Sequence, residues 1–70
     1  MKEIIGNLLK KENVRQNLSS LRQEIKDENA LAEALKLLAG EDELLVSFMG
    51  ADDAKTRKNA ALLIGDLHMS

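Results

Sequence analysis

Four apolar residues at positions i, i+1, i+4 and i+5 open the chain, and the same pattern returns 40 residues later. The first set is Ile4, Ile5, Leu8 and Leu9, and the second set is Leu44, Leu45, Phe48 and Met49. This spacing places one apolar stripe along a helix. Because helices this short are marginal on their own, each one needs a packing partner. The repetition predicts two copies of one helical unit.

A longer amphipathic helix is expected after each stripe, and these two helices also match. The stretch VRQNLSSLRQEI begins at Val14 and the stretch TRKNAALLIGDL begins at Thr56, so matched residues lie 42 positions apart. The matched pairs are Arg15 and Arg57, Asn17 and Asn59, Leu18 and Ala60, Leu21 and Leu63, and Ile25 and Leu67. A helical period of about 40 residues is typical of a solenoid repeat.

These patterns predict one all-α domain over residues 1–70, with a partial first repeat over 1–27 and a second repeat over 28–70. About five helices in under two repeats are expected, and the two long ones should lie side by side. The expected helices are Lys2–Lys11, Asn13–Asp27, Ala30–Ala39, Asp42–Met49 and Asp53–Met69.

The ends of these helices carry residues suited to capping. The expected N-terminal caps are Asn13, Asn29, Asp42 and Asp53. Gln16 follows Asn13 in a capping-box arrangement. Gly40 should end the third helix, and Gly50 suits the left-handed backbone that closes a helix. Arg57 lies one turn after Asp53, so the two residues together should bridge the turn and the last helix.

The predicted core consists almost entirely of aliphatic side chains. Its members are Ile5, Leu8, Leu9, Leu18, Leu21, Ile25, Leu31, Leu35, Leu38, Leu45, Phe48, Ala60, Leu63, Ile64 and Leu67. Phe48 is the one aromatic residue, and proline is absent, so nothing in the chain forbids helix. Seventy residues are near the size at which a core only just outweighs chain entropy.

Composition limits the chemistry that this chain can perform. It has no cysteine, which excludes disulfides, thiolate metal sites and a cysteine nucleophile. The N-terminal stretch MKEIIGNLLKKEN has no long apolar run, so neither a signal peptide nor a membrane association is expected. A cytoplasmic compartment is expected, and a nuclear one also fits. The net charge of −2 indicates a well-solvated surface.

The order of elements in the second half resembles one armadillo repeat. A short helix over Asn29–Ala39, Gly40, a helix over Asp42–Met49 and a long helix over Asp53–Met69 follow one another. The stretch LLVSFMGADDAKTRKNAALLIGDL is also similar to the related HEAT repeat. Asp52 or Asp53, together with Arg57, stand where such repeats often keep a turn aspartate and a helix arginine. The assignment to armadillo or HEAT stays open.

This resemblance implies a non-catalytic scaffold for protein–protein interaction, with long helices lining its binding face. Peptide-binding armadillo proteins carry an asparagine and a tryptophan there, whereas the matching positions here are Asp66 or Glu24 and Leu62 or Ser20. Acidic residues at those positions favour a basic partner. The candidate partner-binding residues are Lys58, Leu62, Asp66 and Met69.

Fewer than about three repeats rarely form a stable stack. The chain is therefore expected to be a terminal part of a longer protein whose further helical repeats cover the open end. The alternative is a homodimer that pairs through the exposed face of the last helix. The partner is then another protein, further repeats or a second copy.

A different hypothesis treats the last two helices as a helix-turn-helix that binds nucleic acid. Lys55, Arg57 and Lys58 would then open the recognition helix. Asp52 and Asp53 would lie near the phosphates, the chain is net acidic, and it has little aromatic surface for stacking on bases. These features favour the protein-binding hypothesis.

An enzyme is not expected, and neither a cofactor nor a metal is predicted. His68 is the single histidine, so it has no imidazole or thiolate partner for a zinc site. The carboxylates of Asp52, Asp53 and Glu41–Glu43 lie at helix starts and lack the spacing of a calcium loop. A third hypothesis makes the chain a helical domain appended to a larger enzyme, where it would position other parts.

Overall fold

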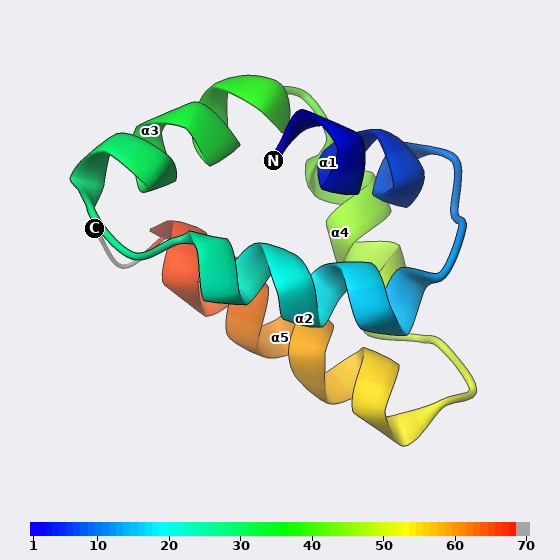
Figure 1. Ribbon diagram of the computed structural model, residues 1–70. Coiled ribbons are helices and arrows are strands. Elements are labelled where there is room, and N and C mark those ends of the chain that lie inside the picture. The colour runs from blue at the N-terminus through cyan, green and yellow to red at the C-terminus, as the bar shows by residue number, and fades with distance from the viewer. Residues whose placement is uncertain (69–70) are drawn as a thin grey trace.

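The computed structural model describes residues 1–68, which form five helices (Figure 1). Their bounds are α1 Lys2–Leu9, α2 Val14–Glu24, α3 Glu28–Leu37, α4 Asp42–Phe48 and α5 Ala54–His68. No strand occurs within this described part of the chain. The predicted all-α class is therefore confirmed.

The helices form two hairpins that stack on each other through their second helices. α1 packs against α2, and α4 packs against α5. α2 and α5 also pack against each other, and they lie side by side (Figure 1). Arg15 pairs with Asp53 at the start of both helices, and Arg22 pairs with Asp66 near their ends. α2 and α5 are therefore parallel, and α3 connects the two hairpins while contacting α5.

The repetition in the sequence is matched by a repetition in burial. Ile5 and Leu8 of α1 are buried, and so are their counterparts Leu45 and Phe48 of α4. The half-buried and exposed positions of these stripes match in the same way, in the pairs Ile4 and Leu44, and Leu9 and Met49. α1 and α4 therefore turn the same side toward the core.

The core lies where these inward sides meet. Its buried apolar members are Ile5, Leu8, Leu18, Leu21, Ala34, Leu38, Leu45, Phe48, Ala60, Leu63 and Leu67. Most of them were predicted, but Leu9 and Leu35 are 42% and 41% exposed. The inward positions there belong to Ala34 of α3 and to Leu38, which directly follows the helix. Because successive helix residues point about 100° apart, Leu35 turns away from them.

Three helices follow an acidic residue, and two of them, α3 and α5, have a side-chain cap, whereas Glu41 makes no cap hydrogen bond to α4. Asp27 caps α3, where its Oδ1 accepts a hydrogen bond of 2.8 Å from the backbone N–H of Ala30. The prediction of Asn29 as this cap was wrong, because the helix begins earlier, at Glu28. Asp53 caps α5 as predicted, by accepting from the backbone N–H of Thr56 at 2.9 Å.

The loop before α2 departs from the predicted capping box. Asn13 has a left-handed backbone with φ 44° and makes no side-chain cap hydrogen bond. Asn17 instead reaches back from the helix, and its Nδ2 donates to the backbone oxygens of Glu12 and Asn13 at 3.1 and 3.0 Å. Gly40 has φ +80°, whereas the left-handed conformation predicted for Gly50 was wrong.

Substitution of two adjacent leucines of α5 tests which side of this helix faces the core. Leu63 is fully buried and Leu62 is 40% exposed. We expect Leu63→Ala to lower the free energy of unfolding by about 2–5 kcal/mol because it leaves a cavity. The matched control Leu62→Ala should lower it by only about 0.5 kcal/mol. Urea denaturation followed by circular dichroism measures both, and equal losses would contradict this packing.

Candidate functional site

The seam between α2 and α5 is held by a half-buried ion pair as well as by apolar packing. Arg22 Nε donates to Asp66 Oδ2 at 2.9 Å, with side chains 31% and 37% exposed. A guanidinium and a carboxylate at this distance form a charge-assisted hydrogen bond. Because the pair joins residues 44 positions apart, it fixes how the two hairpins are aligned.

The predicted partner-binding residues do not form one free surface. Lys58 is exposed and Leu62 is 40% exposed, so both are accessible to a partner. Asp66 is instead committed to Arg22 inside the chain. Met69 lies outside the described residues. Sequence reasoning missed the role of Asp66 because the pair depends on how the hairpins stack.

Positive charge gathers at one end of the molecule. Six of the ten lysine and arginine residues lie in the short stretches 10–15 and 55–58. They are Lys10, Lys11, Arg15, Lys55, Arg57 and Lys58, and all six are exposed. Parallel stacking places the loops before α2 and α5, and the first turns of both helices, on the same side (Figure 1). We call this surface, residues 10–16 and 49–58, the basic end.

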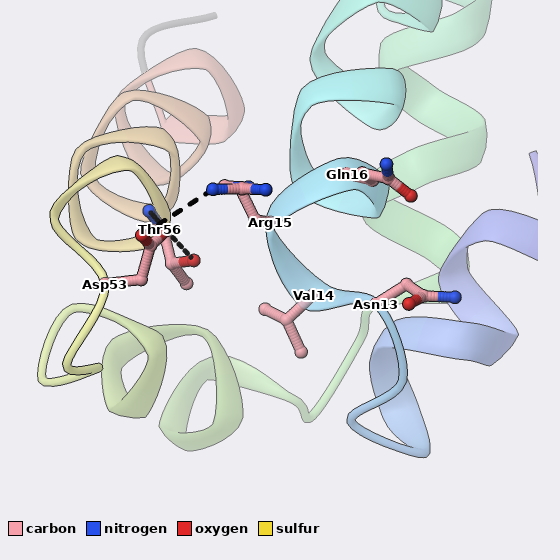
Figure 2. Close-up of a pocket in the computed structure, with 6 residues that line it drawn as sticks. All are labelled: Asn13, Val14, Arg15, Gln16, Asp53 and Thr56. Atoms are coloured by element: carbon pink, nitrogen blue, oxygen red, sulfur yellow. Dashed lines mark hydrogen bonds and ion pairs between the residues drawn. The ribbon is translucent and has the colours of Figure 1, made fainter.

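An open groove of about 350 Å³ lies within the basic end (Figure 2). Its lining residues come from the first turns of α2 and α5 and are Asn13, Val14, Arg15, Gln16, Asp53 and Thr56. Arg15 Nη1 lies 3.7 Å from Asp53 Oδ1, so this ion pair joins the two helices (Figure 2). Both partners are about half exposed, at 55% and 47%.

Asp53 serves the structure rather than proton chemistry. Its Oδ2 accepts hydrogen bonds from the Thr56 hydroxyl at 2.8 Å and from the Thr56 backbone N–H at 2.9 Å. These two hydrogen bonds lower the pKa of Asp53 below 3.8, and the charges of Arg15 and Lys55 lower it further. The carboxylate is therefore ionised at neutral pH, where it caps α5.

Asp53 pairs with Arg15 rather than with Arg57, so the predicted bridge between Asp53 and Arg57 was wrong. Arg57 holds the turn before α5 through backbone carbonyl groups instead. Its Nη1 donates to the backbone oxygens of Ala51 and Asp52 at 2.7 and 2.8 Å. In the first hairpin, Asn17 fastens the loop in the same way, because its side chain also donates to two loop carbonyls. Each loop is thus fastened by a side chain from the helix that follows it.

Three further properties of residues 1–68 concern metal sites, buried polar atoms without a partner and membrane-spanning helices. No three His, Cys, Asp or Glu side chains in this range gather where they could hold a metal ion. Every buried side-chain nitrogen or oxygen described there has a hydrogen-bond partner. The helices described include none with the length and apolar character needed to cross a membrane.

No known protein family matches the chain, and neither a curated protein nor a solved structure is significantly similar to it. The resemblance to armadillo and HEAT repeats therefore stays a prediction. The candidate site is defined by its own residues, namely the basic end and the exposed side of α5 at Lys58 and Leu62.

The Arg22–Asp66 pair can be tested by exchanging its charges. We expect Arg22→Asp and Asp66→Arg each to lower the free energy of unfolding by about 0.5–1 kcal/mol, because each places like charges together. The double variant should recover most of the loss. Gln23→Asp, on the adjacent exposed position, controls for the added negative charge. Thermal denaturation measures the four variants, and an additive double variant would exclude the pairing.

The lowered pKa of Asp53 predicts a pH-dependent contribution to stability. Because the folded-state pKa lies below 3.8, this contribution is present above pH 3.8 and is lost as the pH falls through the folded pKa. Asp53→Asn should therefore lower the melting temperature at pH 7 more than at pH 3. Asp52→Asn removes the same charge one residue earlier, outside the cap. A melting-temperature loss independent of pH would contradict this role.

Proposed function

We propose that the chain is a non-catalytic protein-interaction module built from armadillo- or HEAT-like helical hairpins. The observation that supports it is the recurrence of one burial pattern in α1 and α4, together with the parallel stacking of α2 on α5. Helical repeat proteins stack equivalent helices in this way and bind partners on the extended surfaces that result. A cytoplasmic or nuclear compartment belongs to the same proposal.

The internal repeat indicates where further repeats would dock. Arg15 and Arg22 are the residues through which α2 pairs with α5. Their counterparts 42 positions later are Arg57 and Ile64, so a following unit would cover that side of α5. Ile64 is only half-buried, which leaves apolar surface for such a contact. A second copy of the chain is the other candidate for this position.

Partner binding is assigned to the exposed side of α5 at Lys58 and Leu62. An exposed leucine beside a lysine offers both apolar area and charge to a protein surface. Asp66 contributes by holding Arg22 in place at the edge of this side. The proposal makes Leu62 the residue on which affinity depends most.

A nucleic-acid-binding function is the second candidate, and the basic end is the observation that favours it. Lys55, Arg57 and Lys58 are all exposed at the start of α5, as a helix-turn-helix would need. Phe48, the single aromatic residue, is buried and cannot stack on bases. We therefore rank this function behind protein binding.

The proposed function is tested by capture followed by titration. Immobilised chain is exposed to nuclease-treated extract of its source cells, and each retained protein is purified and titrated against the chain by calorimetry. We expect Leu62→Arg to weaken binding at least about tenfold, because it places a charge in the apolar contact. Ala32→Arg, on the exposed side of α3, is the control that should bind normally.

Two results would count against protein binding through α5. Retention that disappears with nuclease treatment would support the nucleic-acid function instead. Equal affinity of a purified partner for the wild type and for Leu62→Arg would remove the exposed side of α5 as the contact surface.

A further inference from the structure

The chain has a pronounced separation of charge that its net charge of −2 conceals. The basic end holds six cations and three anions, Glu12, Asp52 and Asp53, which gives +3. The remainder of the chain therefore carries −5. The positive ends of the α2 and α5 dipoles and the negative ends of the α1 and α4 dipoles lie at this same end, so the helix dipoles oppose one another there and the side chains supply the net charge. One end of the molecule therefore attracts anions, and the rest repels them.

Most of this positive charge is available to a ligand. No ion pair described within residues 1–68 involves Lys10, Lys11, Lys55 or Lys58. Arg15 reaches Asp53 only at 3.7 Å, with a side chain that is 55% exposed. Since exposed pairs of this length contribute little, binding of an anion by Arg15 would cost little.

Exposed apolar side chains adjoin the charged loops. Leu9 ends α1 directly before the first loop and is 42% exposed. Met49 follows α4 at the matching position before the second loop and is 39% exposed. Both positions repeat in the two hairpins, so each loop of the basic end begins with an apolar contact point. A phosphate backbone offers nothing apolar to such points, whereas a peptide does.

We propose that the basic end binds an acidic protein segment that also carries apolar side chains. This inference extends the proposed protein-binding function: it adds a second contact surface beside the one centred on Leu62 of α5, and it names the chemistry of the segment that this second surface would bind. Carboxylates of the segment would pair with Lys11 and Lys55, and its apolar side chains would cover Leu9 and Met49. Methionine adapts its shape to different apolar partners, which suits recognition of an extended segment.

A nucleic acid fits the same surface less well. Phe48, the single aromatic side chain, is buried and cannot stack on a base.

The test uses fluorescence anisotropy with a short synthetic peptide in which Asp and Glu alternate with Leu. We expect salt-sensitive binding that falls about tenfold or more in Lys11→Glu/Lys55→Glu. The control Lys26→Glu/Lys36→Glu changes the net charge equally at exposed positions outside the basic end and should stay within about twofold of the wild type. Equal weakening by both pairs would overturn the site.

A second comparison tests the apolar part of the inference. Met49→Ser should weaken binding of the leucine-containing peptide but leave unchanged the weaker binding of a peptide with Ser in place of Leu. Tighter binding of a DNA duplex or a single-stranded RNA than of the acidic peptide would overturn the inference in favour of nucleic acid. Absence of peptide binding would overturn it too, while a captured partner that depends on Leu62 would leave the proposed function standing.

Discussion

The packing of α2 against α5 is the interaction on which the rest of the structure depends. α1 and α4 have eight and seven residues, too few to be stable helices alone. Each is covered by the long helix of its own hairpin, and the two long helices bury Leu21 and Leu63 completely. Loss of this seam would leave two hairpins with half a core each.

The direction of that stacking decides where charge collects. Because α2 and α5 are parallel, the loops before them and the cations of their first turns occupy the same end of the molecule. An antiparallel arrangement would place Arg15 and Lys55 at opposite ends and divide the positive charge. The parallel packing of α2 and α5 therefore produces both the groove between the two helix starts and the +3 charge around it.

Structural and recognition tasks are divided among neighbouring residues at the basic end. Asp53 caps α5 and Arg57 fastens the preceding turn, so both are engaged within the chain. Lys55 and Lys58, which alternate with them, remain exposed. This division explains how hydrogen bonds within the chain can fasten the turn while its lysines still present charge to a partner. It also places the cations of the basic end beside helix starts, which hold a binding geometry better than long loops do.

The spacing of apolar residues by itself determined the helices, the all-α class and most of the core, because one apolar stripe per helix allows only one inward side. Local capping chemistry placed Asp53 as the cap of α5, but the caps that it placed at Asn13 and Asn29 were wrong. Only the tertiary structure decided that Leu9 and Leu35 face outward, that Asp66 pairs with Arg22, and that two distant basic stretches meet. These features depend on how one hairpin is set against the other, and residues 38 or 44 positions apart become neighbours only through that packing.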